Sequence, residues 1–331
     1  MKEREVLKSK VRNNKIDIIK AICIFSVICA HTTSVNDTVN RILQLFGVCG
    51  VPIFFFFSSF FFYRGKQYER SREDFWKSKF LHIILPWFLF GSVTWVINNM
   101  FGSRISNLSL ASYFAYMLGY QSHLYFMTIL VLFFLAFRQR NKVVEVIEQF
   151  GLLLSIVAVI YVDRVGLSSL VVYPYLNPLF WIGFWSLGRI LAEIEGERFV
   201  KLIPYLTIID AVFVVAVWVF GRHYISYFSI WTLSLSVLNI LLSFVIFSSS
   251  KKNIKPASIM ATVGRNTQFV YLTHIVVIGA LNLFLKDLWV FDFIKPVLTW
   301  FLYAVLLAGI LKLCSKWSSI KKIVRFVGIK E

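Results

Sequence analysis

The stretch Ile42–Tyr63 reads I-L-Q-L-F-G-V-C-G-V-P-I-F-F-F-F-S-S-F-F-F-Y, contains no charged residue and is long enough to cross the hydrocarbon core of a bilayer. Similar apolar runs recur along the whole chain. Of its 331 residues, 58% are hydrophobic and 18% aromatic, but only 16% are charged. This composition excludes an ordinary soluble domain and predicts a membrane protein built of helices.

Ten apolar segments can form transmembrane helices, some of them extended by flanking residues. We place them at 16–35, 41–63, 80–101, 122–137, 149–162, 175–194, 202–221, 226–248, 267–285 and 295–315. The fourth is short, and Ala111–Tyr120 before it is a candidate interfacial or re-entrant segment. Pro174 and Pro178 interrupt the sixth and predict a kinked or unwound outer end. Because no repeat or Pro/Gly/Ser-rich linker divides the chain, we expect an all-α polytopic membrane protein, a single domain over 1–331 with about ten transmembrane helices.

Lys and Arg residues are concentrated in alternate loops. With the N-terminus inside, 28 of the 35 lie on the cytoplasmic side, six lie outside, and Lys20 lies within the first span. An error in one span would invert every later loop, so this asymmetry supports the count and the orientation together. We expect both termini in the cytoplasm, as a basic arm (1–15) and a basic tail (317–331) beside anionic lipids. The protein is then a multi-pass component of the plasma or inner membrane.

The net charge of +18 is explained by this distribution, and we expect no nucleic-acid partner. The basic arm lacks a signal-peptide pattern, so we expect no cleavage there.

Four cysteines all lie in apolar runs without the spacing of a bridge or a metal site, which predicts buried thiols and no metal. They are Cys23, Cys29, Cys49 and Cys314.

The first span, I-D-I-I-K-A-I-C-I-F-S-V-I-C-A-H (16–31), holds three ionisable side chains: Asp17, Lys20 and His31. Such groups are costly in a membrane and usually face a protein interior or a wet cavity. At about 100° per residue, Lys20 and His31 differ by about 20° in azimuth, and Asp17 lies within about 60° of both. Lys20 is near the cytoplasmic side, and His31 lies about 16 Å further along the axis, in the outer part of the core. Alternatively, Lys20 extends to lipid phosphate and His31 hydrogen-bonds a neighbouring helix.

A second basic cluster, Lys79 and His82, opens the third span in K-S-K-F-L-H-I-I-L-P-W (77–87). The two residues are one helical turn apart, face the same way, and lie close to Lys20 if the first and third spans are neighbours. Positive groups there suit an anionic cytosolic ligand. Ordinary flanking charge accounts equally well for Lys79, but less well for His82 inside the apolar run.

Four further polar residues are candidates for lining a cavity: His123 and Tyr125 at the start of the fourth span, Asp210 in the seventh and His274 in the ninth. For His274, satisfied packing is the stronger interpretation. For Asp210, an interhelical hydrogen bond or a protonated acid explains the residue as well as a site role does.

Several segments resemble the integral-membrane acyltransferase type 3 family, in order along essentially the whole chain. The first span has the family's pattern of a basic residue, ten intervening residues and then a histidine, with an aspartate three residues before the basic residue. Four other segments are similar to family elements: G-V-P-I-F-F-F-F-S-S-F (Gly50–Phe60), K-x-x-H-I-I-L-P-W (Lys79–Trp87), H-L-Y-F (His123–Phe126) and Y-L-T-H (Tyr271–His274).

The chain departs from the family pattern at four positions. Lys20, Lys79 and His82 stand where arginines are typical, and Ser59 replaces the usual Gly. Lys is a point charge without the bidentate fork of Arg, so the departures bear on how a donor is held. Family members linked to export or succinylation of poly-N-acetylglucosamine also depart at the second-span Gly. The chain resembles those members in this respect.

The resemblance implies transfer of an acyl group, usually acetyl from acetyl-CoA, to a hydroxyl of an envelope glycan or lipid-linked sugar. In this hypothesis Lys20, Lys79 and His82 hold the CoA phosphates at the cytoplasmic side, and Asp17 fixes the donor end by pairing with Lys20 or a loop Arg. His31 acts as general base on the acceptor hydroxyl or as transient acyl carrier. If a residue orients His31, it must come from another helix.

Two other functions fit the same features. One is an exporter or flippase of a glycan, in which the polar face of the first span lines the path without covalent chemistry. The other is a structural scaffold in a polysaccharide-synthesis complex, for which His31 is dispensable. The sequence leaves open the acceptor, acetyl against succinyl, and the oligomeric state.

Overall fold

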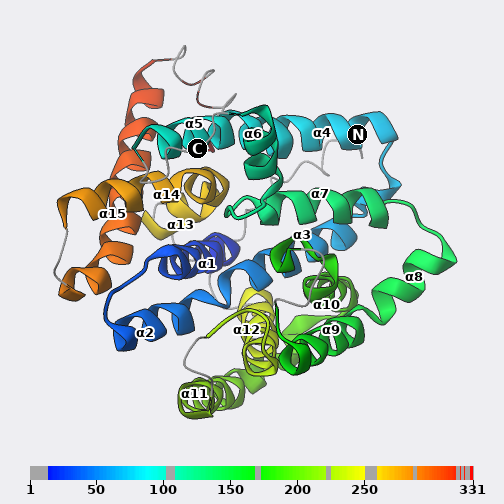
Figure 1. The fold of residues 1–331 in the computed structure, drawn as a ribbon. Coiled ribbons are helices and arrows are strands. Elements are labelled where there is room, and N and C mark those ends of the chain that lie inside the picture. Colours follow the sequence, from blue (N-terminus) through cyan, green and yellow to red (C-terminus); the bar gives the residue numbers. More distant parts are fainter. Residues whose placement is uncertain are drawn as a thin grey trace.

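The computed structural model describes residues 14–101, 109–167, 173–220, 225–249, 259–285, 289–317, 321, 324 and 329–330. Within these ranges the chain consists of helices and connecting segments and contains no β-strand. The α-helices are α1 (Asn14–His31), α2 (Asp37–Gly47), α3 (Gly50–Arg64), α4 (Arg72–Lys79), α5 (Leu85–Phe101), α6 (Leu110–Leu118), α7 (Tyr125–Phe137), α8 (Lys142–Gln149), α9 (Gly151–Val165), α10 (Ile182–Ala192), α11 (Ile203–Phe220), α12 (Ile230–Ser248), α13 (Ile259–Arg265), α14 (Thr267–Phe284) and α15 (Trp289–Lys316) (Figure 1). Tighter or wider turns form η1 (Gln67–Glu69), η2 (Phe80–Ile84), η4 (Pro174–Leu176), η5 (Pro178–Phe180) and η6 (Gly196–Leu202).

Seven helical segments of the described chain are long and apolar enough to cross a membrane. They are Asp37–Arg64, Arg72–Met100, Lys142–Val165, Gly196–Phe220, Ile230–Ser248, Thr267–Phe284 and Val290–Lys316, and the shorter α7 and α10 are also apolar. The helix α1 is long enough as well, but it carries Lys15, Asp17 and Lys20. The chain is therefore an all-α polytopic membrane protein, as the sequence predicts. The count of ten spans, the single domain and the cytoplasmic termini stay predictions, and the arm up to residue 13 and most of the tail lie outside the described residues.

Helix α1 runs through the middle of the bundle and is packed against α2, α3, α12, α13, α14 and α15 (Figure 1). Small residues allow the closest approach. The Ser26 hydroxyl donates to the Phe46 carbonyl at 2.6 Å and accepts from the Gly50 amide at 3.0 Å. A Cβ on Gly50 would lie 2.5 Å from the Cys23 carbonyl oxygen, so only glycine fits this crossing. These contacts fix α1 against the junction of α2 and α3, the two halves of the second predicted span.

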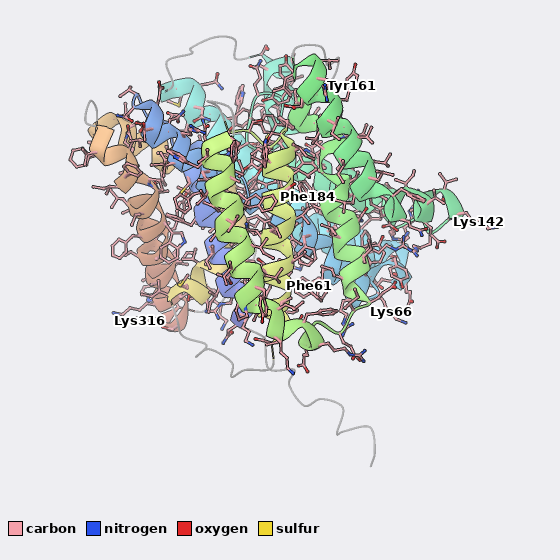
Figure 2. The ribbon with its side chains drawn as sticks, turned by 90° about the horizontal axis from the view of Figure 1, so that it is seen from below. Phe61, Lys66, Lys142, Tyr161, Phe184 and Lys316 are labelled. Atoms are coloured by element: carbon pink, nitrogen blue, oxygen red, sulfur yellow. The ribbon has the colours of Figure 1, made fainter. Side chains whose placement is uncertain are left out.

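The periphery of the bundle is apolar, as lipid contact requires. In α11, Val217 is the one buried residue, whereas Ile208, Val212 and Val215 are exposed. Figure 2 shows the helices side-on, with Lys66 and Lys316 near one end and Tyr161 at the opposite end. Both lysines belong to segments that the sequence places in the cytoplasm, and Tyr161 lies at the predicted outer end of its span.

The sixth predicted span is unwound at its outer end. Pro174 and Pro178 each begin a single 3-10 turn, η4 and η5, before α10 starts at Ile182. Proline removes a backbone donor and disfavours α-helical geometry at the preceding residue, which explains the interruption. The kink predicted from these two prolines is confirmed.

The segment before the fourth span, predicted as an interfacial or re-entrant piece, forms the short helix α6. Ser109 caps its N-terminus by accepting from the Ser112 amide at 3.1 Å. Gly119 ends it at φ 93°, and a Cβ there would overlap the backbone of Tyr125. The turn after Gly119 thus brings His123 and Tyr125 back against the bundle.

Phe-rich α3 faces the interior. Phe55, Phe56 and Phe62 are fully buried, with Trp181 and Trp185 of the α10 region against them. This Phe-rich run therefore serves the packing of neighbouring helices. Among the cysteines, three are buried, Cys49 is half-buried, and all four are free thiols.

Candidate active site

His31 is the last residue of α1, so the helix ends four residues before the predicted end of the first span. The Thr32 hydroxyl donates to the Ile28 carbonyl at 2.9 Å, and the Ser34 hydroxyl accepts from the Asn36 amide at 3.1 Å, so these side chains satisfy backbone groups locally where the helix ends. Ser34 then donates to Asp292 Oδ2 at 2.6 Å, and Lys295 donates to Asp292 Oδ1 at 2.7 Å. The buried Asp292–Lys295 pair of α15 therefore anchors the segment that directly follows His31.

Three histidines from three separate parts of the chain meet at this point. The ring of His31 lies 5.0 Å from that of His274 and 6.0 Å from that of His123, between centroids, and the last two rings are 5.1 Å apart. His274 is fully buried in α14, His123 is nearly so in the turn before α7, and His31 is half-buried. Within the described chain these rings do not form a group with the spacing of a metal centre.

The hydrogen bonding of His274 fixes its tautomer. Its Nδ1 lies 2.7 Å from the Tyr271 carbonyl oxygen, which can only accept, so Nδ1 carries the proton. In the neutral ring, Nε2 is then an unprotonated acceptor. This atom is buried and has no hydrogen-bond partner among the described residues. His274 can therefore accept a hydrogen bond from an adjacent imidazole, which is how a second group orients a catalytic histidine.

A cavity of about 320 Å³ opens beside His31, and we call it the histidine cavity. Its lining includes His31, His123 and Tyr125, together with further tyrosines and amides: Asn98, Tyr116, Gln121, Tyr173, Tyr175 and Tyr227. Gln121 adopts φ 54°, a conformation that non-glycine residues seldom hold without a reason. The sequence analysis missed most of this set. The polar pair at Asn98 and Asn99 inside the third span was the available signal.

A second cavity of about 280 Å³ lies toward the other end of α1, and we call it the basic cavity. Lys20 and His82 both line it, as the sequence predicts if the first and third spans are neighbours. Arg265 and Lys330 line it too and were missed, because both were counted as ordinary flanking charge. No Asp or Glu is among its described lining residues. The described lining is therefore basic in composition, which suits an anionic ligand.

A π-helical turn decides which way His82 faces. Pro86 has no N–H to pair with the His82 carbonyl, and its ring would clash with that carbonyl in an α-helix. The chain responds with the wide turn η2 over Phe80–Ile84. His82 faces the basic cavity, but Lys79 does not line it. The Lys79 ammonium instead donates to Gln67 Oε1 at 2.8 Å and lies 3.8 Å from the centroid of the Phe134 ring.

The two cavities approach each other at Tyr271. This residue lines the basic cavity, and its hydroxyl donates to the backbone carbonyl of His123, which lines the histidine cavity. The ring of Phe126, also in the basic cavity, packs on Tyr271 with centroids 5.4 Å apart. The two cavities are thus adjacent, with Phe126 of α7 and Tyr271 of α14 at their junction.

The remaining candidates lie in other settings. Asp17 is fully buried in the first turn of α1 and lines neither cavity. Asp210 accepts a hydrogen bond from Asn239 Nδ2 at 2.7 Å, which joins α11 to α12. This is the interhelical hydrogen bond that the sequence offered as one explanation of Asp210. Tyr125 lines the histidine cavity with its ring stacked on Trp181.

The sequence of the chain can also be compared with models of known protein families. Residues 13–314 match a family model described as an acyltransferase domain. The match runs from α1 almost to the end of α15 and includes every residue of both cavities except Lys330. Comparison with curated proteins and with solved structures finds no match. Because this match covers most of its length, the chain belongs to the acyltransferase type 3 family and is a membrane acyltransferase.

Proposed function

We propose that this protein transfers an acyl group, acetyl in the first instance, from cytosolic acyl-CoA to a hydroxyl of an envelope glycan or lipid-linked sugar in the plasma or inner membrane. One observation carries the proposal. A basic cavity and a histidine cavity lie on either side of Tyr271, and α1 contributes Lys20 to the first and His31 to the second. A transferase with an anionic donor on one side and a neutral acceptor on the other needs two such sites.

The chemistry of the basic cavity suits the donor. Acyl-CoA carries phosphate groups at one end and an uncharged thioester at the other. Lys20, His82 and Arg265 supply cationic or hydrogen-bonding partners for phosphates, and the apolar wall beside them, including Phe126 and Met127, suits the pantetheine arm. Because Lys79 lies outside this cavity, we assign donor binding to Arg265 in its place. Asp17 would act indirectly, by fixing the first turn of α1.

The histidine cavity suits a sugar. Its tyrosine rings offer flat apolar faces, and the amides of Asn98 and Gln121 offer both donors and acceptors for hydroxyl groups. These are neutral groups, so the cavity favours an uncharged acceptor over a second anion. The acceptor hydroxyl would lie beside the His31 imidazole.

His31 would act as general base. Its imidazole takes the proton of the acceptor hydroxyl while the hydroxyl oxygen attacks the thioester carbonyl, and the tetrahedral intermediate collapses with cleavage of the C–S bond. The proton returns from the imidazolium to the leaving sulfur, which gives an ester and CoA thiol. His274 would position His31 by accepting its second N–H through Nε2, with the Tyr271 carbonyl holding the His274 ring.

The test compares envelope glycans, by mass spectrometry, from cells that produce the wild-type protein, the His31→Ala variant or no protein. We expect one acyl mass increment in wild-type cells only, and its size distinguishes acetyl from succinyl. Thr33→Ala, an exposed neighbour of His31 that does not line the cavity, is the matched control and should keep the increment.

Kinetic assays in nanodiscs with radiolabelled acetyl-CoA separate the roles of the two cavities. His31→Ala should lower kcat by about 10²- to 10⁴-fold, the range for loss of a general base. Lys20→Ala should raise the KM for the donor with kcat largely intact. Full acylation by His31→Ala would overturn the mechanism. Glycan export that continues without any acyl increment would favour the exporter alternative.

A further inference from the structure

A third cavity, of about 330 Å³, lies where α9 and α11 end and α12 begins, and we call it the outer cavity. These are helix ends that the sequence places on the outer side of the membrane. Asp163 lines the cavity from α9, Phe220 from α11, and Trp231 and Thr232 from α12. None of its lining residues belongs to the histidine cavity or the basic cavity. Its volume is similar to that of the histidine cavity and falls in the range of small-molecule pockets.

The outer cavity combines aromatic rings with hydroxyl groups. The rings of Phe220 and Trp231 are nearly parallel, with centroids 6.3 Å apart, and both side chains are exposed. The Ser226 hydroxyl accepts from the Phe228 amide at 3.2 Å, and no described residue accepts its proton. A sugar ring has apolar faces and hydroxyl edges, so an exposed aromatic ring beside an O–H donor suits it. An interfacial aromatic belt would account for the two rings but not for the cavity beside them.

The outer cavity adjoins the histidine cavity. Tyr227 lines the histidine cavity, whereas the residues on either side of it, Ser226 and Phe228, line the outer cavity. The Phe228 ring also lies 4.9 Å, between centroids, from the ring of Tyr175, which lines the histidine cavity. The Tyr227 hydroxyl donates to the Gly47 carbonyl at 3.0 Å, which fixes this junction against α2. A ligand too long for the histidine cavity therefore has a second site next to it.

We propose that the outer cavity binds a second sugar unit of the acceptor, so that the acceptor is an oligosaccharide or polysaccharide and not a single sugar. This inference rests on the proposed function, since it takes a glycan hydroxyl as the group beside His31. The reacting unit would occupy the histidine cavity, while a neighbouring unit lies against Trp231 and accepts from Ser226. Contacts with the second unit add binding energy that is the same before and during the reaction, so they lower the KM of longer acceptors and leave kcat unchanged.

The experiment measures acylation of glycan fragments of graded length by the full-length protein in nanodiscs, with radiolabelled acetyl-CoA. Partial hydrolysis of envelope glycans from cells that lack the protein supplies the fragments, which are sorted by size into single sugars and longer chains. We expect the wild type to have a KM about tenfold lower for chains than for single sugars. Trp231→Ala should raise the KM for chains about tenfold, the loss of one aromatic contact, with kcat and the KM for single sugars unchanged.

Three further variants separate a binding contact from a structural effect. Trp231→Phe keeps an aromatic ring and should restore most of the affinity for chains. Ser226→Ala should raise the KM for chains about threefold to tenfold, the effect of losing one hydrogen bond. Tyr161→Ala removes an exposed ring from the same end of the bundle that does not line the outer cavity (Figure 2), and this matched control should behave as the wild type.

Three results would overturn the role of the outer cavity and leave the proposed function standing. They are equal wild-type KM values for single sugars and chains, an unchanged KM for chains in Trp231→Ala, and an equal rise for both kinds of acceptor in that variant. An effect of Trp231→Ala that follows the lipid composition of the nanodisc would also overturn it, because a lipid would then occupy the cavity. A wild-type protein that acylates no fragment of any length would instead overturn the proposed function.

Discussion

His31 and His274 come from opposite ends of the chain, and their rings lie 5.0 Å apart between centroids at the end of α1. His274 donates from Nδ1 to the Tyr271 carbonyl, so the unprotonated Nε2 remains to receive a proton donor. This placement supports the proposal that His274 positions His31. The sequence indicated that such a partner, if present, must come from another helix, but did not identify it.

We expect His274→Ala to lower kcat by about tenfold to a hundredfold while the KM for acetyl-CoA stays near the wild-type value. The reason is that a misplaced base costs turnover, whereas the donor cavity is untouched. Steady-state assays in nanodiscs, with the melting temperature measured alongside, check this. A raised donor KM at unchanged kcat would show that His274 does not position His31.

Glu148 is predicted to be a structural anchor between α8 and α10. Its carboxylate is fully buried, 3.1 Å from Arg140 and 3.3 Å from Arg189, and accepts a hydrogen bond from Trp185 Nε1 at 3.3 Å. Glu148→Gln leaves two guanidinium groups without their shared anion and should lower the free energy of unfolding by about 2–3 kcal/mol, less than for a wholly buried pair because both arginines are partly exposed.

The matched control for Glu148 is Glu145, which is half-exposed and pairs with Arg140 at 3.1 Å. Glu145→Gln should cost less than about 1 kcal/mol. Denaturation in detergent micelles, followed by tryptophan fluorescence, measures both variants. Equal losses would mean that the burial of Glu148 does not determine the strength of its contacts.

Gly264 is predicted to be irreplaceable for packing. A Cβ at this position in α13 would overlap the backbone of Asp17 in α1. Gly264→Ala should therefore separate the two helices, lower the melting temperature and weaken CoA binding at the neighbouring Arg265. Gly279→Ala in α14 has open space around its Cβ and should be neutral or stabilising by up to about 1 kcal/mol, since glycine is a poor helix former. Thermal unfolding of both variants decides this, and a Gly264→Ala protein as stable as wild type would contradict it.

Asp210 is predicted to contribute to the stability of the fold and not to acyl transfer. Its bond from Asn239 ties α11, which is otherwise exposed to lipid, to α12. Asp210→Leu should lower the free energy of unfolding by about 1 kcal/mol, the usual size of an interhelical hydrogen bond in membranes, and leave the kinetics of transfer unchanged. Asp210→Asn keeps an acceptor and should match the wild type in both measurements. A loss of turnover in Asp210→Asn would return this residue to the list of site candidates.

The sequence alone was sufficient for features that depend on local composition. Apolar run length sets the membrane-spanning helices because lipid cannot satisfy exposed backbone groups. Prolines unwind the start of the sixth span because they remove backbone donors, and the shared face of Lys20 and His31 follows from helix geometry. These properties need no knowledge of what packs against what.

Local geometry was insufficient where a turn departed from the regular helix. An α-helical third span would place Lys79 and His82 on one face, but the π-helical turn before Pro86 separates them. The end of α1 at His31 likewise depends on the anchor from Ser34 to Asp292, a contact with a helix near the other end of the chain.

The tertiary structure alone decided the composition of the two cavities. His123 and His274 join His31, and Arg265 and Lys330 join Lys20, because α13 and α14 pack against α1 and the turn before α7 lies beside His31. The amino-acid sequence carries no periodic signal of such contacts. The pairing of helix faces depends on shape and on close crossings at small residues, which only the folded bundle defines. His31 could be singled out from the sequence as the candidate base, and only the fold brought His274 beside it and Arg265 beside Lys20.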